Sequence, residues 1–260
     1  MIRWKLSALA VLLLLASSGW CAAQGSGSEP LVSDRPDFTE STATVSAGRL
    51  QLEAGYTFSK RGKDEEHALG ELLLRIGLMP DVELRLAGNS YVWLNSPSGD
   101  AQGFEDMSVG VKIKLVEGSG ELTRPEVAVI VATSLPTGDD DFGEDGSQPG
   151  IKLALAWDLS ERISLASNLN YTYASTGGDR FHQFSGSLSL GYRLSERWGC
   201  YIEYFGFVPE RENGPNASFF DGGLTYLIND NLQLDARVGI GVFNAESPDY
   251  FTGFGVSWRY

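Results

Sequence analysis

Residues 50–59 read LQLEAGYTFS, and this stretch sets the pattern for most of the chain. Every even-numbered position is apolar, while Gln51, Glu53, Gly55, Thr57 and Ser59 occupy the odd-numbered positions. Successive side chains of a β-strand point to opposite faces, so this alternation predicts a strand with one apolar and one polar or small face.

The same alternation returns along the rest of the sequence. It covers residues 71–76, 82–89, 106–115, 127–131, 151–158, 163–173, 185–193, 198–204, 220–228, 232–242 and 250–260. Tight turns are expected at 79–81, 160–161, 195–196 and 229–231, with a longer one at 117–124. Long polar loops are expected at 94–104, 135–148, 174–181 and 209–217. Short turns on one side and long loops on the other are typical of bacterial outer-membrane barrels.

The sequence therefore predicts an all-β fold, a transmembrane antiparallel up-and-down β-barrel of about 12 strands over residues 49–260, with both termini on the periplasmic side. A soluble β-sandwich also alternates. Two features favour the barrel. The expected strands are longer than the roughly five or six residues usual in soluble sheets, and aromatic residues lie near the strand ends. Those aromatic residues, expected to form interfacial girdles, are Trp157, Tyr173, Tyr192, Trp198, Trp258 and Tyr260.

The chain begins with a pattern typical of a secretory signal peptide. Arg3 and Lys5 precede an apolar run over 6–16, and the small residues Ala22 and Ala23 precede the expected cleavage site. Removing residues 1–23, which hold two basic residues and no acidic ones, takes the formal net charge from −14 to −16. Such a surface is unsuited to nucleic acid. Cys200 is the one cysteine left, so no intramolecular disulfide is expected.

Residues 24–48 precede the first strand and follow the signal peptide. This periplasmic N-terminal segment is expected either to enter the barrel as a plug or to remain a loose tail. The sequence leaves both alternatives open.

The polar face of the strands is expected to point into the lumen. It carries eight acidic and eight basic residues: Glu53, Glu71, Glu83, Asp106, Asp158, Glu203, Asp221 and Asp235 against Arg75, Arg85, Lys112, Lys114, Lys152, Arg193, Arg237 and Arg259. Charges in a partly dehydrated interior need partners, so a balanced set predicts ion pairs that brace the wall. A strongly ion-selective pore is not indicated.

Five phenylalanines share this inward parity near the long-loop ends of the last strands. They are Phe205, Phe207, Phe219, Phe243 and Phe251. One interpretation is an aromatic patch inside the extracellular mouth that captures an apolar or aromatic solute. The other is that the parity slips at the strand ends and the rings belong to the outer girdle.

An enzymatic site is not predicted. A lipid hydrolase would need a serine activated by a histidine, and His67 and His182 lie in no recognisable catalytic spacing. The acidic loop with Asp139, Asp141 and Asp145 lacks the closing Glu of a calcium loop, so no metal or other cofactor is expected.

Three stretches resemble known sequences. The C-terminal residues GFGVSWRY place Phe254, Val256, Trp258 and Tyr260 on one face, which resembles the signal read by the barrel-assembly machinery. Residues 33–60, SDRPDFTESTATVSAGRLQLEAGYTFSK, and residues 133–140, TSLPTGDD, resemble the outer-membrane β-barrel family labelled phenol-degradation meta-pathway transporters. The resemblance implies a barrel with a transport-like role and does not fix a substrate.

The expected function is that of a channel or transporter for small hydrophobic or aromatic molecules. A structural or adhesive barrel with a closed lumen is the alternative, and a lipid-modifying enzyme ranks behind both. The expected partners in the outer membrane are lipid, lipopolysaccharide, the assembly machinery and a small-molecule solute.

Overall fold

The computed structural model describes residues 29–209, 211, 213–242 and 247–260. The predicted signal peptide, residues 1–23, lies outside the described residues. Among the described residues, no helix has the length and apolar character needed to cross a membrane.

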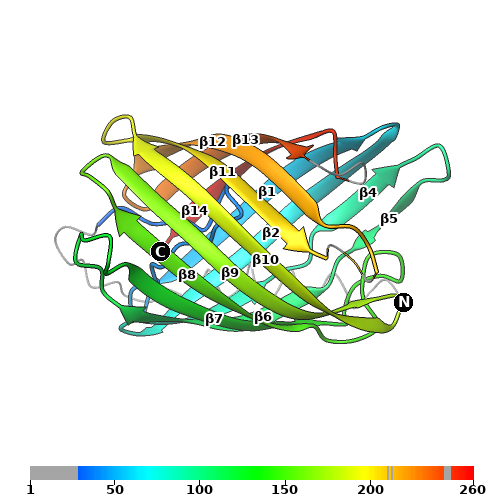
Figure 1. Cartoon of the computed structure of the whole chain (residues 1–260), viewed down its shortest axis with the longest axis horizontal. Coiled ribbons are helices and arrows are strands. Elements are labelled where there is room, and N and C mark those ends of the chain that lie inside the picture. The colour runs from blue at the N-terminus through cyan, green and yellow to red at the C-terminus, as the bar shows by residue number, and fades with distance from the viewer. Residues whose placement is uncertain (1–28, 210, 212, 243–246) are drawn as a thin grey trace.

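The described part of the chain is built from strands (Figure 1). They are β1 (Leu50–Arg61), β2 (Asp64–Met79), β3 (Val82–Ala87), β4 (Tyr91–Asn95), β5 (Ala101–Phe104), β6 (Met107–Val116), β7 (Glu126–Leu135), β8 (Pro149–Asp158), β9 (Ile163–Thr176), β10 (Asp179–Arg193), β11 (Trp198–Val208), β12 (Ala217–Asn229), β13 (Leu232–Val242) and β14 (Tyr250–Arg259).

These segments form one closed antiparallel barrel. β1 pairs with β2 on one side and with β14 on the other, which closes the wall. β2 pairs with β3 through residues 73–79 and with β4 through residues 65–69, so β3 and β4 lie end to end. β5 and β6 continue each other in the same way, against β4 and β3. The predicted barrel of twelve strands is therefore confirmed, with two of its strands interrupted.

The interruptions coincide with an irregularity in β2. The register between β1 and β2 shifts between Glu53 and Gly55, and the facing residue Gly70 has φ +112°, a conformation suited to glycine. Glu71 follows with φ +40°. Along the chain, β2 pairs with β4 before this bulge and with β3 after it.

The connections follow the predicted asymmetry with two corrections. Residues 80–81, 194–197 and 230–231 are short turns, and residues 136–148 form a long loop. The connection between β11 and β12 is also long, and residues 210 and 212 within it lie outside the described residues. Residues 94–104, however, largely form the β4–β5 hairpin, which projects at the end opposite the C-terminus (Figure 1). Residues 174–181 are also mostly strand, because Gly177 and Gly178 have positive φ and make a two-residue turn.

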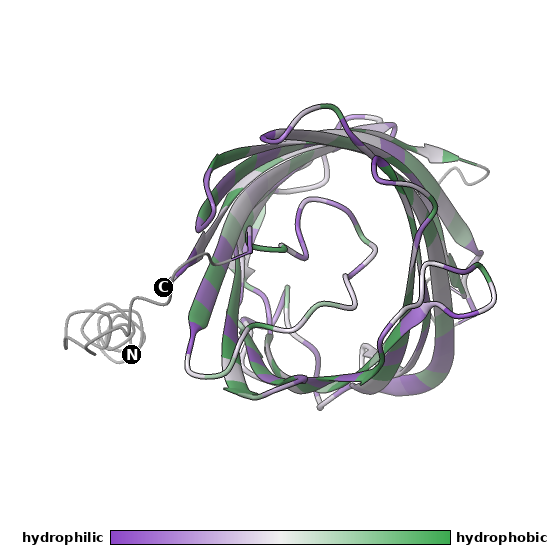
Figure 2. Ribbon diagram, turned by 90° about the vertical axis from the view of Figure 1, so that its left-hand side faces the viewer, coloured by the Kyte–Doolittle hydropathy of each residue, from purple (hydrophilic) through white to green (hydrophobic). Residues whose placement is uncertain are grey.

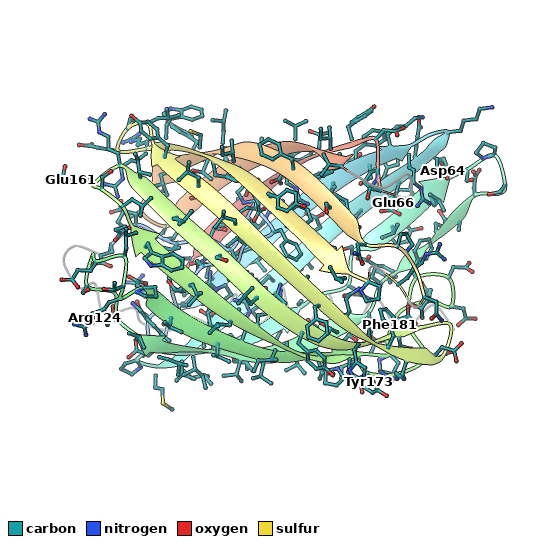
Figure 3. The ribbon with its side chains drawn as sticks, viewed as in Figure 1. Asp64, Glu66, Arg124, Glu161, Tyr173 and Phe181 are labelled. Atoms are coloured by element: carbon teal, nitrogen blue, oxygen red, sulfur yellow. The ribbon has the colours of Figure 1, made fainter. Side chains whose placement is uncertain are left out.

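The wall is apolar outside and polar inside, the reverse of a soluble protein. Leu169, Val238 and Phe254 are each about three-fifths exposed, with exposed fractions of 58%, 61% and 61%. Side chains project from the whole length of the outer surface (Figure 3). By contrast, Arg75 and Lys112 are fully buried inside. Exposing leucine and phenylalanine to water is unfavourable, so this arrangement indicates a wall whose outer surface faces hydrocarbon.

Candidate functional site

The lumen contains part of the protein's own chain. Residues 29–48, called the inner segment below, run inside the barrel (Figure 2). The backbone N–H of Leu31 donates to the Asp230 carbonyl at 2.8 Å, and that of Gly48 donates to the Gly77 carbonyl at 2.9 Å. The described part of the N-terminal segment, residues 29–48, thus lies within the wall of the barrel.

Asp34 anchors the inner segment to one side of the wall. Its carboxylate lies 2.6 Å from Arg85 Nη1, 2.8 Å from Lys112 Nζ and 3.3 Å from Arg75 Nη1. Arg75 also pairs with Glu83 at 2.9 Å. These five side chains form a buried ion-pair cluster contributed by β2, β3, β6 and the inner segment.

Glu40 makes a second anchor. Its carboxylate lies 2.6 Å from Arg85 Nη2 and also contacts Lys152. Burial alone would raise the pKa of Asp34 and of Glu40. The neighbouring cations nevertheless hold the pKa of Asp34 well below its usual value and lower that of Glu40. Both carboxylates are therefore ionised and bind the basic wall residues tightly.

The predicted wall bracing is thus only part of the ion-pair network. Glu53, Glu83, Arg75 and Arg85 pair with one another across the wall, but the inner segment supplies the shared acid, Asp34. Sequence reasoning missed this role, although Asp34 and Glu40 stand in an acidic run, SDRPDFTE.

Several of the remaining predicted lumen charges fall into two groups, whereas Asp106 lies at the long-loop end and accepts from the backbone N–H of Thr137 and Gly138. Arg35 of the inner segment lies 2.7 Å from Glu71 and 3.5 Å from Asp235, and Arg237 donates to the Pro36 carbonyl at 2.9 Å. Residues of the second group lie toward the short-turn end. Lys114 pairs with Glu117 there, Arg259 donates to the Glu29 carbonyl, and Arg193 and Asp158 line a cavity.

The phenylalanines gather on the other side of the lumen. Phe205 and Phe219 stack with ring centroids 4.7 Å apart and planes 13° apart, and Phe207 meets Phe219 edge-on at 6.2 Å. Phe251 meets Phe219 at 6.4 Å. Phe243 lies outside the described residues. The four described rings form what is called the aromatic patch below, and it is covered by a ring that the sequence did not point to.

That ring is Phe38 of the inner segment. It stacks on Phe205 with centroids 4.5 Å apart and planes 8° apart. Glu203 holds the adjoining backbone, because its carboxylate accepts from the N–H of Phe38 at 2.7 Å and of Thr39 at 2.8 Å. Ser189 donates to Asp37 at 3.1 Å. Burial and the nearby Glu203 carboxylate raise the pKa of Asp37 well above its usual value.

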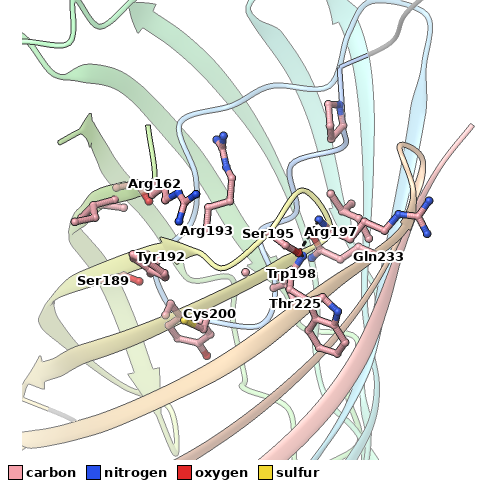
Figure 4. Close-up of a pocket in the computed structure, with 18 of the residues that line it drawn as sticks. Arg162, Ser189, Tyr192, Arg193, Ser195, Arg197, Trp198, Cys200, Thr225 and Gln233 are labelled. Carbon is pink, nitrogen blue, oxygen red and sulfur yellow. Dashed lines mark hydrogen bonds between the residues drawn. The ribbon is translucent and has the colours of Figure 1, made fainter. Parts of the chain in front are cut away.

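A cavity of about 690 Å³ opens beside this part of the inner segment (Figure 4). Its lining includes Pro36 and Asp37 on one side and Ser189, Tyr201 and Arg193 on the wall. The cavity extends to the short turns 159–162 and 194–197. The lumen is therefore filled asymmetrically: the ion-pair cluster packs one side, and open space remains along β9–β13.

The family described as "Putative MetA-pathway of phenol degradation" matches residues 33–260. The chain belongs to this family. The match confirms the resemblance seen in residues 33–60 and 133–140, and it includes most of the inner segment.

Solved structures similar to this family member are outer-membrane barrels. An outer-membrane channel from Pseudomonas putida F1 is 13% identical with a TM-score of 0.61, over 84% of this chain and 97% of that one. The NanC porin is 14% identical with a TM-score of 0.55, over 80% and 98%. The KdgM porin, solved with disordered oligogalacturonate, is 11% identical with a TM-score of 0.51, over 82% and 99%. No curated protein sequence matches the chain.

These likenesses concern the fold. The family member shares its barrel with channels and porins of the bacterial outer membrane.

Both histidines of this family member lie on the outer surface. His67 Nδ1 is 2.7 Å from the Tyr56 hydroxyl, and His182 Nδ1 is 2.8 Å from the Tyr171 hydroxyl. Each histidine packs among aromatic rings, His67 against Trp93 at 4.8 Å. Within the described residues, no group of three or more His, Cys, Asp or Glu side chains is placed to hold a metal ion.

Proposed function

We propose that this protein is an outer-membrane channel for small hydrophobic or aromatic molecules. The observation that carries the proposal is the aromatic patch inside an otherwise polar lumen. On a surface of stacked rings, a planar apolar solute gains more binding free energy than the burial of its surface alone provides.

The solute path runs along β9–β13, beside the inner segment. The aromatic patch lies near the long-loop ends of β11, β12 and β14, where a solute enters from outside the cell. The cavity next to Asp37 reaches the short turns on the periplasmic side. The inner segment acts as a plug that narrows the lumen to this one side.

The comparisons support the same proposal. One structure with the same fold is described as an outer-membrane channel, and the description of the family refers to phenol degradation. Aromatic solutes are therefore the natural cargo to test. The similar structures named above are channels and porins, which supports a role other than catalysis.

The outer surface of the barrel fits the other expected partners, which are the assembly machinery, membrane lipid and lipopolysaccharide. Phe254, Val256, Trp258 and Tyr260 all face outward, as a C-terminal signal for the assembly machinery requires. The apolar exterior and its aromatic girdles fit membrane lipid and lipopolysaccharide.

A closed structural barrel is the second candidate. The buried ion pairs that hold Asp34 and Glu40 favour it, because they fix the inner segment firmly inside the lumen. This candidate predicts that no solute crosses, whatever the composition of the aromatic patch.

Replacing Phe205 and Phe219 together with leucine tests the proposed channel. Leucine keeps the apolar bulk but removes the stacking surface. We therefore expect cells that express the double variant to take up phenol about two- to tenfold more slowly, after the uptake of cells without the protein is subtracted. The measurement is the initial rate of uptake of radiolabelled phenol.

The matched control is Phe184→Leu, which changes a phenylalanine on the outer surface of β10. This variant should take up phenol at the unmodified rate. An unchanged rate in the Phe205 and Phe219 double variant, with the protein present at equal amounts in the outer membrane, would refute the role of the patch.

A further inference from the structure

We propose that Phe38 is a built-in competitor for the solute: its ring occupies the aromatic patch and has to leave when an aromatic solute binds. This inference rests on the proposed function. It adds a gate to the channel and names the residue that forms it.

The geometry of Phe38 is that of a bound aromatic ligand. Phe38, Phe205 and Phe219 form a continuous stack, with centroid separations of 4.5 and 4.7 Å and interplanar angles of 8° and 13°. Phe207 stands edge-on to Phe38 at 5.4 Å. Phe38 is the outermost ring of the stack and is only partly buried, whereas Phe205 and Phe219 are buried beneath it. A planar solute that used the patch would take the position of Phe38.

The segment around Phe38 is fastened by buried ion pairs on both sides and by hydrogen bonds in the middle. Asp34 and Glu40 are fixed by buried ion pairs. Between these anchors, the backbone of Phe38 and Thr39 is held by Glu203 alone among the wall carboxylates. Asp37, in the same stretch, accepts a hydrogen bond from Ser189 at 3.1 Å. The anchors keep the segment in the lumen while Phe38 can be displaced.

Space for the displaced residue is present next to it. The 690 Å³ cavity borders Pro36 and Asp37, directly before Phe38 in the chain. Displacement therefore requires a local change of residues 37–39 and leaves the ion-pair cluster in place.

A reversible disulfide tests the displacement directly. The Thr39 and Ser187 hydroxyl oxygens lie 2.6 Å apart, so cysteines at both positions, in a Cys200→Ser background, are close enough to bridge. The bridge pins the residue next to Phe38 to β10 without filling the patch. Phenol binding to the refolded exported chain is measured by isothermal titration calorimetry, before and after reduction.

We expect the oxidised protein to bind phenol about tenfold or more weakly than the same protein after reduction, because only the reduced form can vacate the site. The matched control joins Ser33→Cys to Ser257→Cys, whose hydroxyl oxygens also lie 2.6 Å apart. That bridge fastens the inner segment before Asp34, so oxidation should leave phenol affinity unchanged.

A second variant, Phe38→Leu, removes the competing ring without a bridge. Phenol should bind to it about two- to tenfold more tightly than to the unmodified protein, because the stack is free. Equal affinities of the oxidised and reduced Thr39–Ser187 pair, with Phe38→Leu unchanged, would overturn the gate but leave the channel standing. Absence of phenol binding in every form would overturn the gate and the aromatic cargo together. Ion current in a bilayer tests whether the protein is a channel, independently of the gate and of the aromatic cargo.

Discussion

Replacing Arg75 with methionine is expected to lower the free energy of unfolding of the barrel by about 3–5 kcal/mol, the usual effect of removing one partner from a buried ion pair. Arg75 is fully buried. Its guanidinium donates to Glu83 at 2.9 and 3.0 Å, to Glu53 at 3.1 Å and to the carbonyl of Ala43 at 2.7 Å. Methionine fills similar space but leaves three buried carboxylates, those of Asp34, Glu53 and Glu83, without this cation.

The effect is measured by equilibrium unfolding in urea of protein folded into phospholipid vesicles. Arg61→Met is the matched control, because Arg61 is exposed and its 3.9 Å pair with Asp64 should contribute about 1 kcal/mol at most. Equal stability of the two variants would show that the buried cluster does not hold the wall together.

The second large effect is expected from Lys112→Met, and it concerns the inner segment more than the wall. Lys112 Nζ donates to Asp34 at 2.8 Å and to the Ser41 carbonyl at 2.9 Å. Losing a buried charge partner of this kind corresponds to about a 100-fold or larger shift in the docking equilibrium. Hydrogen exchange of the amides of residues 34–45 should therefore accelerate by about two orders of magnitude.

Lys114→Met is the control for this variant. Lys114 lies two positions further along β6 and pairs with the exposed Glu117 at 2.7 Å and more distantly with Glu126 at 3.6 Å, so its loss should disturb the inner segment far less than the loss of Lys112. The strand amides report on the barrel itself and should remain protected in both variants. Unchanged exchange of residues 34–45 in Lys112→Met would mean that other contacts suffice to dock the segment.

The barrel was predictable because alternation is a local property that each strand carries by itself. Glu53, Glu83, Lys112 and Glu203 all point inward, as their parity predicts. The interruptions of two strands were not predictable, because they depend on the bulge at Gly70, which the alternation does not reveal.

The inner segment was the main gap in the sequence-based account. Its residues have no period of two, and an irregular stretch gives no sign of where it lies. Its acidic residues could be seen in the sequence, but their positions relative to the basic wall residues depend on how the strands close into a barrel. Asp34 and Arg75, for example, are distant in the sequence and meet only in the folded lumen. Phe38 escaped notice for the same reason.

The central claim is that a path for small molecules runs through the lumen beside the inner segment. The most direct test is the single-channel current of the refolded exported chain in a planar bilayer, with a chain lacking residues 29–46 recorded in parallel. We expect small discrete steps for the complete chain and several-fold larger steps after the deletion, because the inner segment occupies part of the lumen. Silent bilayers with both chains, each folded as a barrel, would contradict the claim.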